Sequence, residues 1–303
     1  MTDTALPAAA PAPTESPLRR IIAEFAESRL ALLGVAMLVL FVGAALLAPL
    51  LVPQDPYDLA TLDILDARLP PGEVSGTGLV FMLGSDGQGR DMLSAMLYGL
   101  RISLFVGVTA VALALAIGAS AGLLAAYIGG RTESIIMRTV DIQLSFPAIL
   151  VALILLALLG NGVDKVIIAL VAVQWAYFAR AARGAALVER NKEYVEAARC
   201  LGISRARLLL RHLLPNCLPP LIVIATVDIA RSITLEATLS FLGLGVPVTE
   251  PSLGMLIANG FDYLLSGVYW ISVFPGVLLT LVIIAINLVG DQLRDVLNPR
   301  LKR

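Results

Sequence analysis

The side chains best placed to do chemistry are charged groups inside an otherwise apolar run. Asp228, Arg231 and Glu236 lie between Cys217 and Phe241, and at about 100° per residue they fall within an arc of roughly 140° on a helix. If this run crosses a bilayer, each charge costs ~2.5–3.5 kcal/mol near its centre. We therefore expect the three side chains to face a protein interior or a watery cavity, where they could line a transport pathway.

The spacing of these charges suits a structural role equally well. Asp228 and Arg231 are three residues apart, and oppositely charged side chains at this spacing pair on one face of a helix. A pathway role and a packing role therefore both stay open. Asp141, at the start of another apolar run, is a further candidate for the pathway.

Two motifs resemble catalytic signatures but lack the context that the chemistry needs. Gly118–Gly122 matches the Gly-x-Ser-x-Gly nucleophile elbow, which requires a strand-to-helix turn and a histidine partner. It lies instead in an apolar run where Ala114, Gly118, Gly122 and Ala126 recur every four residues, a spacing that lets two helices pack closely. The glycine-rich segment 84–91 lacks the Gly-Lys-Ser/Thr of a phosphate-binding loop. We therefore predict no catalytic residues and no ATP site.

Metal and redox chemistry are not indicated either. His212 is the single histidine, so the chain cannot build a site from several histidines. Cys200 and Cys217 lack the Cys-x-x-Cys spacing of redox and metal motifs. We expect free thiols, no metal site and no cofactor.

One segment, Glu193–Pro215, is far more charged and patterned than its surroundings. It suggests two short helices: Gly202 can adopt the left-handed conformation that ends the first, Ser204 can cap the second, and Pro215 is expected to end the segment. A turn glycine followed by a basic helix also fits a helix-turn-helix that binds DNA. The flanking sequence must decide between these interpretations.

The composition is that of a membrane protein. Of the 303 residues, 58% are hydrophobic and 15% are charged, whereas soluble domains carry about 25% charged residues. The net charge of −1 gives no overall footprint for nucleic acid. We predict an all-α membrane protein, in contact with lipid, whose six transmembrane helices are apolar runs long enough to cross ~30 Å of hydrocarbon. These runs are Leu30–Leu51, Ile102–Gly130, Asp141–Gly160, Val166–Ala186, Cys217–Phe241 and Trp270–Gly290.

The runs divide the chain into predicted regions. We expect a flexible cytoplasmic tail (1–28), a first span (29–54), an acidic periplasmic insert (55–100) and a core of five further helices (101–293). The core carries a cytoplasmic loop (187–216) and a periplasmic loop (242–268), and a basic cytoplasmic tail (294–303) follows it. Leu30–Leu51 exceeds the ~7–15 apolar residues of a cleaved signal peptide, so an uncleaved span is favoured.

The charge distribution predicts the orientation. Of 22 Lys and Arg residues, only Arg68, Arg90, Arg101 and Lys165 fall on the side of the acidic insert, and Arg231 lies within a span. The positive-inside rule then places both termini and the Glu193–Pro215 segment in the cytoplasm. Because that segment is tethered to the membrane at both ends, its second helix cannot enter a DNA groove with a domain behind it. No nucleic-acid partner is expected.

The cytoplasmic segment resembles the "EAA" loop of ABC importer permeases in Glu196, Ala197, Ala198, Gly202 and Pro215. Segments 83–91, 98–103, 138–147, 239–245 and 287–295 resemble the dipeptide, oligopeptide and nickel branch of that family, and the long first span with its insert resembles the "C"-type subunit. The resemblance implies a binding-protein-dependent (type I) permease fold in a bacterial inner membrane. It also implies that these five loop residues dock the ATPase.

The resemblance further implies that this chain forms half of a translocation pathway for dipeptides, oligopeptides or related small solutes. The expected partners are a second, non-identical permease subunit, two ATP-binding subunits that hydrolyse ATP, and an extracytoplasmic solute-binding protein. An ion-coupled secondary transporter, with Asp228, Arg231 and Glu236 as a relay, is the alternative from a different class. That alternative needs no ATPase, so ATP-dependent uptake would discriminate between the two.

Overall fold

A computed structural model describes residues 17–58, 62–76, 78–247 and 250–297. Regular structure in these residues is helical except for β1 (Glu73–Val74) and β2 (Val80–Phe81), which pair antiparallel with Val74 opposite Val80. Within the described part, five helices are long and apolar enough to cross a membrane. They are α2 (Arg29–Leu46), α4 (Met92–Ile128), α7 (Val163–Glu189), the continuous helix Arg205–Phe241 and α12 (Trp270–Leu297).

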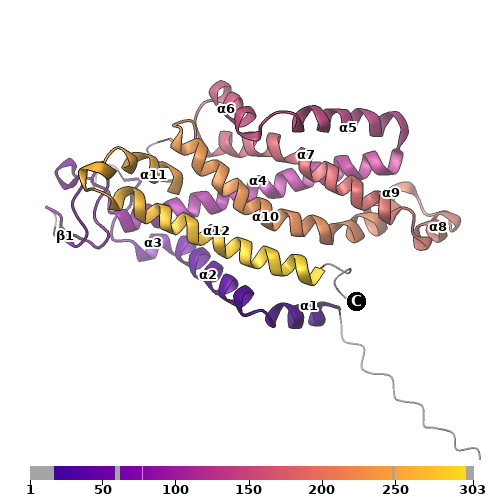
Figure 1. Cartoon of the computed structure of the whole chain (residues 1–303), viewed down its shortest axis with the longest axis horizontal. Coiled ribbons are helices and arrows are strands. Elements are labelled where there is room, and N and C mark those ends of the chain that lie inside the picture. The colour runs from indigo at the N-terminus through magenta and orange to yellow at the C-terminus, as the bar shows by residue number, and fades with distance from the viewer. Residues whose placement is uncertain (1–16, 59–61, 77, 248–249, 298–303) are drawn as a thin grey trace, which may run out of the picture.

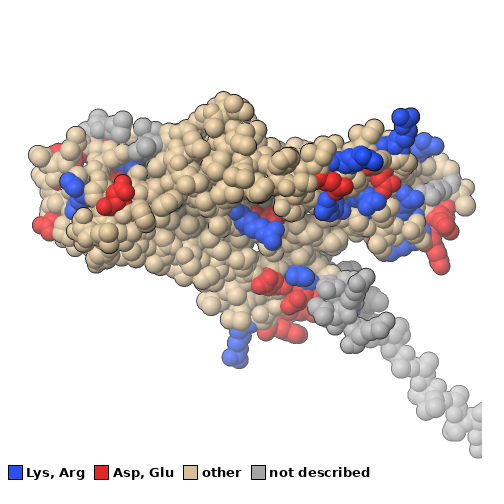
Figure 2. Space-filling model, turned by 45° about the horizontal axis from the view of Figure 1, so that its top comes forward, with Lys and Arg blue, Asp and Glu red and all other residues tan. Residues whose placement is uncertain are grey.

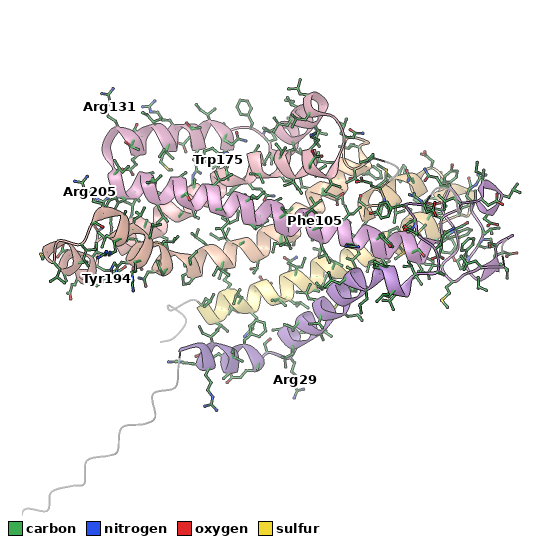
Figure 3. The ribbon with its side chains drawn as sticks, turned by 180° about the vertical axis from the view of Figure 1, so that it is seen from behind. Arg29, Phe105, Arg131, Trp175, Tyr194 and Arg205 are labelled. Carbon is green, nitrogen blue, oxygen red and sulfur yellow. The ribbon has the colours of Figure 1, made fainter. Side chains whose placement is uncertain are left out.

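The long helices lie roughly along one axis of the molecule (Figure 1). The short helix α8 (Glu193–Cys200) marks one end, and the β1–β2 hairpin with α11 (Leu253–Phe261) marks the other. Figure 2 shows most Lys and Arg at the α8 end and a broad, largely uncharged zone between the ends. Arg131, Tyr194 and Arg205 lie together at the α8 end, while Phe105 lies midway (Figure 3). An apolar middle between two charged ends is the distribution that a bilayer requires.

The expected third span is not a straight helix from Asp141 to Gly160. It consists of α5 (Gly130–Leu144) and α6 (Ala148–Leu159), bent by 89° at the break between them. Pro147 causes the break, because it has an extended ψ of 126° at the start of α6 and disfavours helical geometry in the residue before it. With 12 residues, α6 rises ~18 Å, too little to cross a bilayer alone.

The chain also continues as a helix through Pro215, which was wrongly expected to end the basic segment. The short helix α9 (Arg205–Leu208), the π-turn η3 (Leu209–Leu213) and α10 (Leu214–Phe241) follow one another without a gap. A proline ring clashes with the carbonyl four residues earlier in an α-helix. The wider π-turn directly before Pro215 relieves that clash, so the basic segment joins the membrane helix without a break.

Three predicted region boundaries shift. Residues 17–26 of the expected flexible tail form the helix α1 (Pro17–Ala26); residues 1–16 lie outside the described residues. The helix α4 starts at Met92, inside the expected insert, because the Asp91 carboxylate accepts a 2.7 Å hydrogen bond from the Ser94 amide and caps the helix. At the C-terminal end α12 runs to Leu297, into the expected basic tail, whose residues 298–303 lie outside the described part.

The small-residue spacing of α4 packs this helix against α7. A Cβ atom on Gly118 would lie 2.3 Å from the Trp175 carbonyl oxygen, and one on Gly122 would lie 2.2 Å from that of Ala179. Two helix backbones can approach this closely only where side chains are absent. The predicted packing role of Gly118 and Gly122 is therefore confirmed, and the nucleophile-elbow interpretation is excluded because the motif lies within a helix.

Candidate functional site

The Glu193–Pro215 segment forms the expected pair of short helices. Gly202 has a φ of +70°, in the left-handed region, and the Ile203 amide donates a 3.2 Å hydrogen bond to the Ala198 carbonyl. This is a helix-ending motif that glycine favours. Val195 and Ala198 are buried against Leu208 and Leu213, so α8 packs firmly on the start of the membrane helix.

The predicted coupling residues do not all face the same way. Glu196, Ala197 and Gly202 are exposed and can contact another protein, whereas Ala198 is buried within the segment's own small core. Leu201 was not among the predicted coupling residues, but its side chain is 80% exposed beside Gly202. The sequence offers one signal for Leu201: it is an apolar residue in a charged segment, directly before the glycine that ends the helix. Glu196, Ala197 and Leu201 therefore form the exposed edge of the segment.

The end of α7 holds α8 through polar contacts. The Tyr194 hydroxyl donates a 2.9 Å hydrogen bond to the Glu189 carboxylate, and Arg190 donates to the Ala126 carbonyl near the end of α4. Burial, followed by the bond to Glu189, raises the pKa of Tyr194 to about 12. The phenol therefore stays protonated and donating at neutral pH. Tyr194 thus ties α8 to the end of α7, and Arg190 ties the end of α7 to α4.

The charges of α10 do not share one environment. Asp228 and Glu236 are buried, at 5% and 0% exposure, but the Arg231 side chain is 71% exposed. Arg231 lies ~60° to one side of Asp228 around the helix and Glu236 lies ~80° to the other. Asp228 and Glu236 therefore face the protein interior, whereas Arg231 points away from it, because an arc this wide spans an inner and an outer face of the helix.

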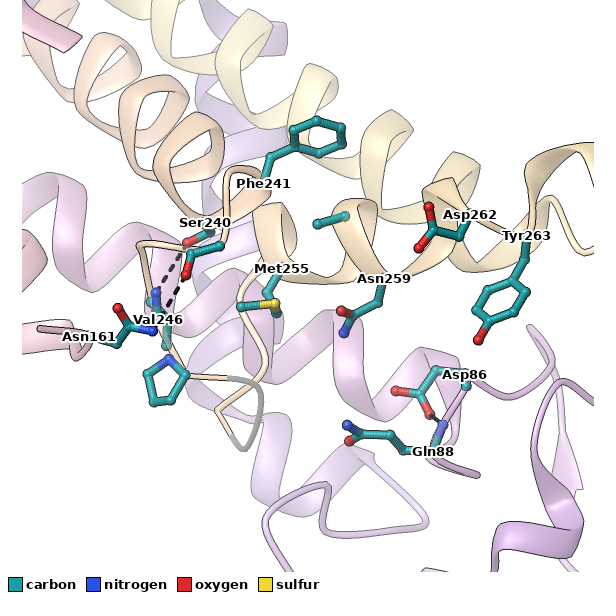
Figure 4. A pocket seen from close by; sticks show the side chains of 14 residues that line it. Asp86, Gln88, Asn161, Ser240, Phe241, Val246, Met255, Asn259, Asp262 and Tyr263 are labelled. Carbon is teal, nitrogen blue, oxygen red and sulfur yellow. Dashed lines mark hydrogen bonds between the residues drawn. The ribbon is translucent and has the colours of Figure 1, made fainter. Parts of the chain in front are cut away.

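Glu236 is the centre of a buried polar cluster. Its carboxylate accepts hydrogen bonds from the Ser103 hydroxyl of α4, at 3.0 Å, and from the Ser240 hydroxyl, at 2.8 Å. The Ser240 oxygen in turn accepts a 3.3 Å bond from the Val246 amide in the loop after α10 (Figure 4). Glu236 thus joins α4, α10 and the following loop, contacts that favour the packing role.

Asp141 belongs to another set of contacts. Its carboxylate pairs with Arg180 at 2.6 Å, with both side chains more than half exposed. A second pair, Glu133 with Arg183, joins the same two helices. These contacts hold α5 against α7, and the structure does not bring Asp141 together with the charges of α10.

Arg231 borders a groove of about 430 Å³ between α10 and α12. The groove combines polar groups with apolar walls, and its lining includes Arg231, Thr234, Thr238, Asn287 and Ile283. Within the described part of the chain, the guanidinium pairs with an Asp228 oxygen, 3.5 Å from Nη1. At this length the hydrogen bond is weak, so the groove carries a largely exposed positive charge.

A second cavity, of about 390 Å³, lies at the opposite end from α8. Its labelled side chains come from the glycine-rich insert loop, the turn between α6 and α7, the end of α10 with the loop after it, and α11 with the residues that follow it (Figure 4). The insert loop is rigid because Asp86 and Arg90 form a buried 2.6 Å ion pair and the Trp270 indole donates to the Ser85 carbonyl at 3.1 Å. Segment 84–91, which was compared above with a phosphate-binding loop, is therefore a wall of this second cavity.

Two family models match the chain. Residues 114–303 match the binding-protein-dependent transport system inner membrane component, and residues 16–71 match the N-terminal TM domain of oligopeptide transport permease C. Together these matches cover the α7–α10 segment with its EAA residues and the first span. They give no support to an ion-coupled transporter.

Curated relatives match nearly the full length. The di/tripeptide transport system permease protein DppC of Pseudomonas aeruginosa is 39% identical over 287 residues, covering 95% of this chain and 93% of that protein. The dipeptide transport system permease protein DppC of Haemophilus influenzae is 36% identical over the whole of both chains. The oligopeptide transport system permease protein OppC of Bacillus subtilis is 36% identical, covering 92% and 88%.

A solved structure supports the fold. The inward-facing MetNI methionine ABC transporter contains a chain that aligns with a TM-score of 0.55 at 22% identity, covering 68% of this chain and 97% of that one. The expected type I permease fold is thereby confirmed. The chain belongs to the binding-protein-dependent transport system inner membrane components, the multi-pass permease subunits of ABC importers, and is of the oligopeptide permease C type.

Proposed function

We propose that this chain is one of two non-identical permease subunits of an ATP-driven importer of short peptides. The observation that carries the proposal is the near-complete coverage by relatives named for di- and oligopeptide transport. Two separate ATP-binding subunits hydrolyse ATP, and an extracytoplasmic solute-binding protein delivers the peptide. Both termini and the 187–216 loop lie in the cytoplasm, while the 55–100 insert and the 242–268 loop lie outside.

The α8 segment is the proposed contact with the ATPases. Glu196 and Ala197 present the exposed surface, Ala198 fixes α8 on its support, and Gly202 sets the direction of the turn. Pro215 marks where the coupling segment becomes the membrane helix. Closure of the ATPases pushes α8, and the contacts of Tyr194 and Arg190 transmit that push to the spans.

The intramembrane charges divide between two roles in this proposal. Arg231 faces the translocation pathway, because an exposed arginine in a membrane helix is costly against lipid. Asp228 sits behind Arg231 and orients it, and Glu236 holds α4 and α10 together. Asp141 secures the bent segment to α7.

Substitution of Gly202 tests the coupling step. Gly202→Asp adds a charge and a side chain at an exposed left-handed position, whereas Gly202→Asn adds a neutral side chain of similar size that tolerates this conformation better. We expect the Asp variant to reach the membrane normally but to lose bound ATPase and uptake of dialanine, and the Asn variant to retain much of both. Normal ATPase binding and uptake in the Asp variant would contradict the proposed contact.

A further inference from the structure

Arg231 lies deep in its helix, at a place where an exposed charge needs an explanation. It is 17 residues after the first residue of α10 and 10 before the last, which puts it ~26 Å and ~15 Å from the two ends. Its side chain is 71% exposed. Since such a position against lipid costs ~2.5–3.5 kcal/mol, this face of α10 borders water or protein.

The face around Arg231 is polar over successive turns. Thr234 and Thr238 follow it along α10, and Asn287 approaches from α12, all lining the same groove. The Thr234 and Thr238 hydroxyls each donate a 2.8 Å hydrogen bond to a backbone carbonyl of their own helix. Their oxygens can therefore still accept a hydrogen bond from a ligand. The Asn287 side chain makes no hydrogen bond to another described residue, so its amide is available to a ligand.

The guanidinium is poorly satisfied by its own helix. Asp228 supplies one contact of 3.5 Å to Nη1 from a side chain that is itself only 7% exposed. A guanidinium has five donors in a planar fork that matches the two oxygens of a carboxylate. Asp228 therefore contacts one end of the fork weakly and leaves the remaining donors open to an anion.

The size and walls of the groove favour a small amphipathic anion. Its volume of about 430 Å³ lies within the ~300–1,000 Å³ of small-molecule sites, and Val227, Leu235 and Ile283 give it an apolar side. Short peptides differ in their side chains but share a terminal carboxylate. A permissive pathway can therefore attract every member of the class through that one group.

We propose that Arg231 binds the C-terminal carboxylate of a peptide as it passes through the membrane, with Asn287 hydrogen-bonding the adjoining peptide group. The apolar wall of the groove accommodates variable side chains without selecting among them. This inference rests on the proposed function, since it takes short peptides as the substrate. An acidic side chain of the second permease subunit is the rival occupant of the fork.

A charge-selective labelling experiment tests the site. Within the assembled transporter, this chain carries Cys200→Ser and Cys217→Ser to remove its own thiols, together with Thr234→Cys in the groove, and its labelling is followed after separation from the other subunits. The rates of labelling by a negatively charged and a positively charged methanethiosulfonate are each divided by the rate with free cysteine. We expect the anionic reagent to be favoured at least roughly fivefold, with the preference lost in Arg231→Gln and kept in Arg231→Lys.

Protection from labelling then identifies the occupant. Dialanine should slow labelling of Thr234→Cys, and dialanine amide, which lacks the carboxylate, should not. Labelling without charge preference, equal protection by both peptides, or no labelling of a transporter that still takes up dialanine would each overturn the inference. Lack of peptide uptake by the unmodified transporter would instead count against the proposed function, because the charge preference is measured without any peptide.

Discussion

Ser103 of α4 donates a 3.0 Å hydrogen bond to Glu236 of α10, although the two residues are 133 positions apart in the chain. Both side chains are buried, at 1% and 0% exposure. Ser240 completes the cluster at 2.8 Å, so the carboxylate is satisfied by hydroxyls and not by a cation. This arrangement ties α4 and α10 together near the loop that follows α10, and it separates Glu236 from the exposed Arg231.

Removing the Glu236 carboxyl should therefore destabilise the protein. Glu236→Ala leaves two buried hydroxyls without their acceptor, at ~1–3 kcal/mol each, while Glu236→Gln keeps an acceptor and the size of the side chain. We expect a clearly lower unfolding temperature in detergent for the Ala variant and a small change for Gln. Ser103→Ala, which removes one bond, should cost about 1 kcal/mol. If Glu236→Gln had normal stability but altered transport, Glu236 would instead be assigned to the translocation pathway.

The contact of α4 with α7 should not tolerate side chains at its glycines. A β-carbon at Gly118 or Gly122 would lie within 2.3 Å or 2.2 Å of a carbonyl oxygen of α7. Overpacking of this kind costs about 1–3 kcal/mol or more, so Gly118→Val and Gly122→Val should lower the amount of folded transporter in the membrane.

Gly184 on α7 is the matched control for these glycines. Nothing lies within 4 Å of a β-carbon built there, and alanine is favoured over glycine in a helix by ~0.8–1.0 kcal/mol. Gly184→Ala should therefore leave the transporter level unchanged or slightly higher. Equal losses at Gly122 and Gly184 would show that the α4–α7 contact is not the cause.

The spans could be predicted because long uncharged runs leave few alternatives for a chain in a bilayer. The same reasoning failed at Asp141–Gly160. The charges of Arg131 and Arg138 excluded the helix α5 from a search for uncharged runs, and Pro147 lies at a bend between two helices and not near the start of one span. Hydropathy finds apolar length, but the direction of a polar helix depends on its ion pairs with another helix, here Glu133 with Arg183.

The candidate site was predicted in part for a similar reason. Helical periodicity gives the angle between Asp228, Arg231 and Glu236 but not which of them faces the core. Only the packing of α4 and α7 against α10 decides that question, through the hydrogen bonds of Ser103 to Glu236 and of Gln174 to Ser232. In the same way, Ala198 belongs to the docking motif by position but supports α8 from within, while Leu201, outside the motif, is exposed.

The pair of Asp141 with Arg180 should contribute little compared with its neighbour. Exposed ion pairs are worth ~0–1 kcal/mol, and these two side chains are 65% and 55% exposed, against 24% and 34% for Glu133 and Arg183. Asp141→Asn should leave dialanine uptake within about twofold, and Glu133→Gln should reduce uptake and stability more. A severe transport defect in Asp141→Asn with normal assembly would place Asp141 in the pathway after all.

The insert loop should depend on its buried ion pair. Asp86 and Arg90 are each 1% exposed and 2.6 Å apart, and removing one member of such a pair costs ~3–5 kcal/mol because the other charge stays buried. We expect Asp86→Ala to open the loop around segment 84–91, so that external proteinase K cleaves the insert in intact spheroplasts. Leu65→Ala is the control, because Leu65 lies in the same insert and its side chain is 88% exposed. Resistance of the Asp86→Ala variant to cleavage would mean that the contact of Trp270 with Ser85 alone holds the loop.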